Sequence, residues 1–375
     1  MKDNDIQDIR AVLSNSAQAE LGELVKYSDV ELFYQRWYEL REDDNALRKY
    51  LSALNLEEWK ARCFVPDPDQ PDLLSYHGIV LTPQNLPIRL TENEFFVMPQ
   101  THNRDIILQK HDRYSPVFLH THEFFEIFYV LSGQCVSAIG DNRSVLSAGK
   151  MCFIAPNTVH TMEVFDDSLI INFIIRKSTF DEFFFNILTM NNILSHFFIG
   201  SLFFPRSSRF IIFDTGRDGE MLRYLFDILL EQKLDDPYSN RIMENQLEIF
   251  FSLLVRKDSQ TPVITRTAGE DHWGIIAYIH EKFRTITLSK TAKQFNFSVP
   301  YCSRLIKSLA GKNFTALVRD IRIMYAKKLL SSSNERMYDI SYSLGFENQE
   351  TFIRTFKKSC GMTPTQFRET GQQSD

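Results

Sequence analysis

The feature that most restricts the fold is a pattern that occurs twice in the last third of the chain, about fifty residues apart. The first copy reads LSKTAKQFNFSVPYCSRLIKSLAG, and the second reads YDISYSLGFENQETFIRTFKKSCG. Asn296 and Gly345 stand where a tight turn between two helices needs a left-handed residue. Ser298 and Asn348 follow and are suited to cap the second helix. The pattern therefore predicts two helix-turn-helix units.

Apolar residues in each second helix recur at the spacing of one buried face, which turns the polar residues outward. A helix-turn-helix unit places its second helix in the DNA major groove, where Arg and Gln read base edges and Lys contacts phosphate. An ordinary helical bundle with charged solvent faces would show the same spacing, and Glu350 with Arg354 would then be a simple helix pair. Spacing alone leaves both interpretations open. The outward residues are Pro300, Ser303, Arg304 and Lys307 in the first unit, and Gln349, Glu350, Thr351, Arg354 and Lys357 in the second.

Charge is distributed unevenly along the chain. From Asp271 onward there are 16 Lys and Arg against 9 Asp and Glu, a net charge of +7, whereas the preceding residues carry −13 of the total of −6. A basic C-terminal third on an acidic body points to a polyanionic partner, although a solvated basic face would look the same.

The second copy extends into DISYSLGFENQETFIRTFKKSCGMTPTQFR, residues 339–368. This stretch resembles the signature of the AraC/XylS family of transcription regulators, with its Gly-Phe turn, Phe-x-Arg-x-Phe-Lys helix and Thr-Pro before an aromatic-Arg close. FNFSVPYCSRLIKSLAGKNF, residues 295–314, is similar to the first unit of that family. The resemblance implies that the outward residues named above, apart from the two lysines, contact bases. Thr291, Cys302 and Ser341 depart from the family pattern and are expected to soften the packing.

A second motif, HTHEFFEIFYV, lies near the middle of the chain. Strand alternation places His120, His122 and Glu126 on one face, and GKMCFIAPNTVH adds His160 further on. The set resembles the cupin barrel, whose metal-binding members hold an ion with three His and one Glu, although Asn157 stands where that motif often has Gly. Imidazole and carboxylate ligands suit Fe, Mn, Ni or Zn.

Several interpretations of this barrel remain open. The sensor domains of AraC-type regulators also resemble cupins. They often carry the same arrangement of residues around a small effector or a packed core. Polar groups on an inner wall also suit a sugar or a carboxylate without an ion. We expect the four residues to form an effector pocket that requires no cofactor, with a divalent metal as the less favoured occupant.

The expected fold class is α+β, an N-terminal cupin-like β-barrel followed by an all-α domain of two helix-turn-helix units. Within residues 179–256, helical periods place Leu225 and Leu247 on apolar faces that we expect at a dimer interface. The expected segments are a helical N-terminal extension (1–72), the cupin-like sensor domain (73–178), a helical dimerisation segment (179–256), a linker (257–270) and the DNA-binding domain (271–370).

These expectations describe a cytoplasmic transcription regulator, an activator, and not an enzyme. It would bind double-stranded promoter DNA as a homodimer, respond to a small-molecule effector and act on RNA polymerase. The competing class is a metal-dependent cupin enzyme, such as an isomerase or dioxygenase, fused to a DNA-binding tail. A third class is a constitutive regulator whose DNA affinity no small molecule alters.

Two further observations bear on the cellular compartment. The five cysteines are scattered and never form a C-x-x-C pair, which indicates a reduced protein without disulfides, and the start MKDNDIQDIR is no signal peptide. FFFNILTMNNILSHFFIG, residues 183–200, approaches a membrane span in length. Its Asn, Ser and His residues favour a buried segment, because polar groups inside a membrane are costly.

Overall fold

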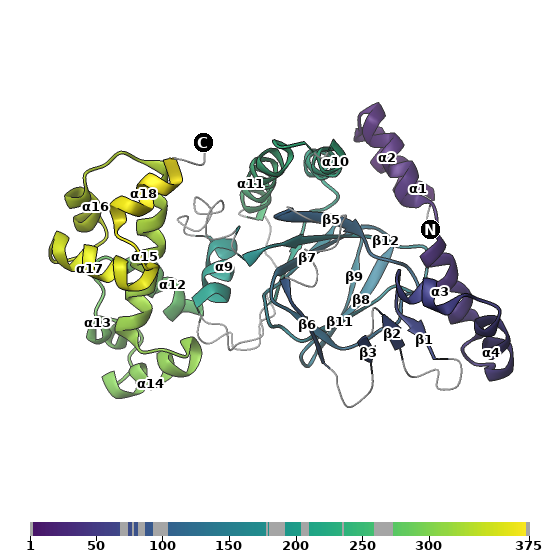
Figure 1. Ribbon diagram of the computed structural model, residues 1–375, viewed down its shortest axis with the longest axis horizontal. Helices are drawn as coiled ribbons and strands as arrows, with labels where there is room; N and C mark the ends of the chain where they lie inside the picture. Colours follow the sequence, from purple (N-terminus) through teal and green to yellow (C-terminus); the bar gives the residue numbers. More distant parts are fainter. Residues whose placement is uncertain are drawn as a thin grey trace. The chain divides into compact units, whose positions relative to one another are not determined.

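The computed structural model divides the chain into two compact units (Figure 1). Unit 1 comprises residues 1–177 and 210–266, and unit 2 comprises residues 178–209 and 267–375. The residues that the structure describes are 3–67, 74–76, 79–81, 87–92, 104–177, 179, 192–203, 210–234, 236–258 and 273–372.

Two five-stranded sheets form the body of unit 1, in the orders β13-β10-β7-β12-β5 and β4-β6-β11-β8-β9. Neighbouring strands pair antiparallel, except that β4 and β6 are parallel. The strands are β4 (Ile88–Leu90), β5 (Ile106–Lys110), β6 (His120–His122), β7 (Phe125–Ser132), β8 (Gln134–Ile139), β9 (Asn142–Ser147), β10 (Lys150–Ile154), β11 (His160–Glu163), β12 (Leu169–Ile175) and β13 (Phe210–Asp214). A small sheet joins β1 (Val65–Pro66), β2 (Leu74–Tyr76) and β3 (Ile79–Leu81).

The core of unit 1 joins apolar side chains from both sheets, for example Phe128 on β7, Cys135 on β8 and Met162 on β11. Every residue of β7 and β12 is buried, whereas burial alternates along β8. The first pattern is typical of strands covered on both faces, and the second of strands with one face toward solvent. The strands predicted between residues 73 and 175 are confirmed where the structure describes them.

Helices cover the first sheet. α10 (Gly219–Leu234) and α11 (Ser239–Asp258) contact it through β5 and β13, and α1 (Asp3–Val12) and α2 (Asn15–Val25) pack on α10 (Figure 1). Leu225 and Leu247 are 1% and 0% exposed inside this layer. The expectation that these two residues lie at a dimer interface is therefore wrong, because they face the core of their own unit.

The N-terminal residues form a second, smaller core. Here α3 (Asp29–Leu40), α4 (Asp44–Ser52) and α5 (Leu56–Lys60) bury Phe33, Tyr34 and Leu51 together with Val65 of β1. Ser28 and Glu31 form a capping box that starts α3. The helices predicted for the first sixty residues are thus confirmed.

The segment between residues 179 and 256 is less uniformly helical than its periodicity predicts. α9 (Ile193–Phe203) is a helix, but it packs on α12 and belongs to unit 2. Residues 210–214 form strand β13, because the β-branched pair Ile211 and Ile212 adds to the edge of the sheet beside β10. Part of the apolar stretch 183–200 lies outside the described residues, and none of the described helices is long and apolar enough to cross a membrane.

Unit 2 contains the two predicted helix-turn-helix units. The first joins α13 (Leu288–Gln294) to α14 (Val299–Ala310), and the second joins α16 (Met337–Ser343) to α17 (Gln349–Cys360). Asn296 and Gly345 adopt φ angles of 55° and 78°, and the side chains of Ser298 and Asn348 cap α14 and α17, as the sequence predicts. Besides α9, the other described helices of unit 2 are α12 (Trp273–Lys282), α15 (Phe314–Ser332) and α18 (Pro364–Gln372).

The departures from the family pattern are accommodated locally. Thr291 and Ser341 are buried, but the Thr291 hydroxyl donates to the carbonyl of Thr287 and the Ser341 hydroxyl donates to that of Tyr338. Cys302 is fully buried and acts as a small apolar side chain. Because each buried hydroxyl is hydrogen-bonded, these positions leave no unpaired donor in the packing.

Candidate functional site

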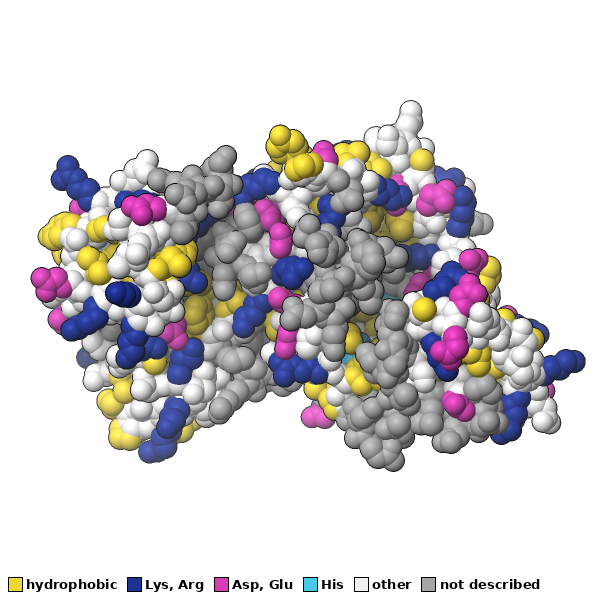
Figure 2. Space-filling view, viewed as in Figure 1, with side chains coloured by type: hydrophobic (Ala, Val, Ile, Leu, Met, Phe, Trp, Pro, Cys, Tyr) yellow, Lys and Arg dark blue, Asp and Glu magenta, His cyan; other side chains and the backbone are white. Residues whose placement is uncertain are grey.

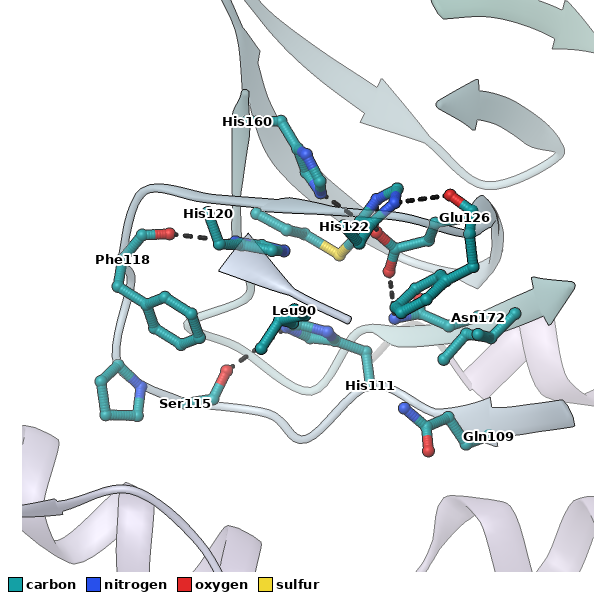
Figure 3. Close-up of a pocket in the computed structure, with 14 residues that line it drawn as sticks. Leu90, Gln109, His111, Ser115, Phe118, His120, His122, Glu126, His160 and Asn172 are labelled. Carbon is teal, nitrogen blue, oxygen red and sulfur yellow. Dashed lines mark hydrogen bonds and ion pairs between the residues drawn. The ribbon is translucent and has the colours of Figure 1, made fainter. Parts of the chain in front are cut away.

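The four side chains predicted to line the barrel meet at one place in unit 1 (Figure 3). β6 carries His120 and His122, β7 carries Glu126, and β11 carries His160. His160 is the register partner of His120, which sets these two rings 4.2 Å apart between centroids. Asn157, before β11, adopts a φ of 62°, which explains how it replaces the glycine of the cupin motif. The structure therefore brings all four predicted residues together.

Backbone carbonyls orient the three imidazole rings. Each Nδ1 atom lies 2.7–3.2 Å from a carbonyl oxygen, belonging to Phe118 for His120, Phe124 for His122 and Thr158 for His160. A carbonyl only accepts, so the hydrogen-bond network assigns a proton to each Nδ1 atom. Histidines that bind metals are commonly oriented in this way.

The Nε2 atoms of two rings point toward one carboxylate. Nε2 of His160 and Nε2 of His122 lie 3.0 Å and 3.2 Å from Oε2 of Glu126, and Asn172 donates to Oε1 at 3.0 Å. Nε2 of His122 has no hydrogen-bond partner in this arrangement, although the carboxylate is close. The Nε2 atoms of two rings and one carboxylate oxygen thus converge on one point.

Burial dominates the electrostatics of the cluster. It lowers the pKa of His120 to about 3 and also lowers the pKa of His122, so both rings are neutral near pH 7. Burial by itself raises the pKa of Glu126, but the contacts with His122 and His160 outweigh it and hold that pKa well below its usual range. The Glu126 carboxylate is therefore held ionised inside the cluster.

A cavity of about 160 Å³ lies beside the cluster (Figure 3). At roughly 30 Å³ for each water molecule in the liquid, it has room for about five waters or a small organic molecule. None of the described residues that line it is Lys or Arg. These residues are Leu90, Gln109, His111, Ser115, Pro116, Phe118, His120, His122, Phe124, Glu126, His160, Met162, Asn172 and Ile174.

Sequence reasoning missed the polar residues on the other walls. Gln109 and His111 come from β5 and the residue after it, and Ser115 lies 3.3 Å from Nε2 of His111. Asn172 is the only polar residue of β12, LIINFII, and its Oδ1 is buried without a hydrogen-bond partner. A single Asn inside an apolar strand was the signal that could have identified it, because a buried amide needs partners.

The donor set fits a metal ion. His120, Glu126 and His160 offer ligand atoms within 4.8 Å of one another, and Nε2 of His122 lies close to the same carboxylate oxygen. Two to four imidazole and carboxylate ligands suit Zn, Fe, Ni or Mn. Such an ion would neutralise the charge of the buried Glu126 carboxylate.

A candidate nucleic-acid interface lies on unit 2. Among the predicted contact residues, Pro300, Arg304, Lys307, Glu350, Arg354 and Lys357 are exposed, and Ser303, Gln349 and Thr351 are half-buried. The opposite faces of the two helices are fully buried. They carry Cys302 and Ile306 on α14, and Phe352 and Phe356 on α17. Lys and Arg side chains are spread over the visible surface of this unit (Figure 2). Tyr301, 44% exposed on α14, is a surface aromatic that sequence reasoning did not single out.

Comparisons with known proteins match both units. A family model described as a helix-turn-helix domain matches residues 291–370, and one described as an AraC-like ligand binding domain matches residues 104–184. The chain therefore combines an AraC-like ligand binding domain with a helix-turn-helix domain, the combination found in AraC-type transcription regulators.

The relatives that this chain matches are named as regulators. It is 38% identical over 96 residues to the uncharacterized HTH-type transcriptional regulator YobQ of Bacillus subtilis, which covers 25% of the chain but only 40% of that relative. It is 23% identical over 251 residues to the HTH-type transcriptional activator RhaS of Escherichia coli, covering 67% of the chain and 87% of the relative. A point variant of apo ToxT from Vibrio cholerae, a solved structure, is 16% identical with a TM-score of 0.32, covering 71% and 97% of the two chains. The matched families and relatives are transcription regulators, not enzymes.

Proposed function

We propose that this protein is a cytoplasmic AraC-type regulator that binds double-stranded promoter DNA through α14 and α17 and responds to a small ligand in the cavity. The observation that supports this most directly is the pair of capped, outward-facing second helices in unit 2. The cavity of unit 1, which is lined by polar and apolar side chains, supplies a site for the effector, a sugar or another small polar molecule. Effector binding would shift the population of DNA-binding states, and RNA polymerase would read out the result.

Arg304→Ala and Arg354→Ala are expected to relax sequence specificity, each by about 1–3 kcal/mol if the guanidinium reads a guanine. Lys307→Ala and Lys357→Ala are the matched controls, which should weaken binding to all DNA alike and flatten the salt dependence. Fluorescence anisotropy at fixed salt, with operator and scrambled duplexes, measures both effects. Arginine variants that keep the wild-type ratio between the two duplexes would place base recognition elsewhere.

We also propose that the protein is a homodimer, held through the exposed face of the α10–α11 layer. Tyr238, Ile242 and Ile249 are 72%, 38% and 44% exposed, and the last two lie on one face of α11. Two-fold symmetry would then match paired DNA half-sites. Ile242→Asp with Ile249→Asp should give folded monomers in analytical ultracentrifugation. An intact dimer in that double variant would move the interface to another surface.

A divalent metal is the second candidate occupant of the cavity, favoured by the converging Nε2 and Oε2 atoms described above. When bound, an ion would supply a positive charge and open coordination positions for an effector. His160→Ala should weaken binding of Zn²⁺ by at least about tenfold. His111→Ala is the matched control, because this ring lines the cavity outside the cluster and should leave zinc binding unchanged. Equal calorimetric affinities for both variants would reject the metal site.

A further inference from the structure

One continuous stretch of backbone forms the rim of the cavity, and we name residues 110–120 the rim segment. It begins at the last residue of β5 and ends at the first residue of β6. His111, Ser115 and Phe118 of this segment line the cavity, and His120 belongs to the cluster (Figure 3). The other side of the rim segment contacts the N-terminal helices, which lie outside both matched family ranges.

The start of the rim segment is held by a buried ion network. The Glu31 carboxylate on α3 accepts from Nε and Nη2 of Arg113 at 2.8 and 3.1 Å, and from Nζ of Lys110 at 2.5 Å. The side chains of Glu31 and Arg113 are 0% and 1% exposed. Arg113 also donates to the carbonyl of Lys26 at 3.0 Å, and its guanidinium stacks on the ring of Tyr27. Two cations of the rim segment are therefore fixed by one carboxylate of α3.

The end of the rim segment reaches α3 by a second route. The rings of His120 and Phe118 lie 5.1 Å apart between centroids, and those of Phe118 and Phe64 lie 4.8 Å apart. The backbone N–H of Phe64 donates to the hydroxyl of Tyr34 on α3 at 3.0 Å. A chain of direct contacts thus runs from the histidine cluster to a buried side chain of the N-terminal core.

Both routes end on the same face of one helix. Glu31 and Tyr34 are three residues apart on α3 and both are buried, so they move as one rigid turn. Packed side chains with few voids transmit a displacement because they cannot absorb it. A change in the position of His120 or His111 is therefore passed to α3 at two points.

We propose that α3 and the N-terminal helices packed on it are coupled to the cavity through the rim segment, so that occupancy of the histidine cluster changes the packing of α3. This inference rests on the proposed function, in that the cluster binds a ligand. Coupling between two sites is reciprocal, so loosening the contact between α3 and the rim segment also changes ligand affinity. The N-terminal extension would then be part of the sensing mechanism and not only a structural addition.

Zinc sulfate, a redox-inactive probe, tests the coupling in the full-length chain. In a Trp273→Phe background the remaining tryptophans are Trp37 and Trp59, both packed in the N-terminal core. Zinc binding is measured by calorimetry. The emission of these two tryptophans is expected to change with zinc, with a midpoint at the same zinc concentration. Glu31→Gln is expected to weaken zinc binding at least about fivefold, the lower range of measured couplings between sites.

Glu20→Gln is the matched control. Glu20 is also a buried N-terminal carboxylate paired with a lysine, but its partner Lys233 belongs to α10 and not to the rim segment. This variant should bind zinc as wild type does. Wild-type zinc affinity in Glu31→Gln, with unchanged emission, would overturn the coupling and leave the proposed function intact.

A second measurement needs no ligand, so it tests the coupling even if zinc does not bind. Absence of zinc binding would reject only the metal site. Hydrogen exchange of the full chain is compared between wild type and Glu126→Gln, which alters the cluster without touching α3. Amides of α3 are expected to exchange at least about fivefold faster, whereas those of α1, which packs on α10, should not change. Unchanged exchange in α3 would overturn the proposal.

Discussion

Gly345→Ala is expected to destabilise the DNA-binding unit by about 2–5 kcal/mol and to abolish specific DNA binding. Gly345 has a φ of 78°, where an L-residue is strained by roughly 1–2 kcal/mol. A Cβ atom at this position would also lie 2.0 Å from the carbonyl oxygen of Arg284, a backbone atom that cannot move aside as a side chain can. Overpacking of this kind typically adds about 1–3 kcal/mol. Chemical denaturation and operator binding by anisotropy measure the two effects.

Gly361→Ala separates strain from steric conflict. Gly361 ends α17 with a φ of 77°, almost the same angle, but a Cβ atom there meets no other atom within 4 Å. This variant should therefore cost only about 1–2 kcal/mol, the left-handed penalty alone. Equal losses for the two variants would show that the contact with Arg284 contributes nothing.

The turn at Gly345 shows what the sequence could and could not predict. The need for a left-handed residue follows from local spacing, as does the cap at Asn348, because both depend on neighbours in the chain. The contact with Arg284 joins residues sixty-one positions apart and has no local signal. The same limit explains why the helix-turn-helix units and their outward faces could be predicted, while the packing between their helices could not.

In unit 1 a different cause limits what the sequence can predict. Alternation along a single strand was enough to bring His120, His122 and Glu126 to one site, although the structure divides that strand into β6 and β7, which belong to different sheets. Asn172 lies on β12 and His111 directly follows β5, and both reach the cavity because of the order of the strands in the sheet. The periodicity of the sequence carries no information on that order. β13 was missed because its sequence FIIFD, apolar apart from the last residue, fits a helix and a buried strand equally well.

Arg113→Met is expected to destabilise unit 1 by about 3–5 kcal/mol, the usual loss when one partner of a buried ion pair is removed. Glu31 would keep Lys110, the start of α3 and the backbone N–H of residue 113 as partners for its buried charge. Urea denaturation followed by the emission of Trp37 and Trp59 reports on this unit. The matched control is Arg62→Met, which removes an exposed pair with Asp29 on the same helix and should cost less than about 1 kcal/mol.

The dependence on pH provides an independent check of the Glu31 network. Burial alone would raise the pKa of Glu31, but hydrogen bonds from Arg113 and Lys110 outweigh it and lower that pKa to about 2. A carboxyl whose pKa is lowered on folding stabilises the protein above its ordinary pKa of 4.5, and this stabilisation is lost as the pH falls toward about 2. In Arg113→Met the main cause of the lowering is gone, so the difference in stability between wild type and variant should shrink as the pH falls below 4.5. A difference that stays constant from neutral pH to about pH 3 would mean that Glu31 is not held ionised by Arg113, and the buried network would then contribute through packing alone.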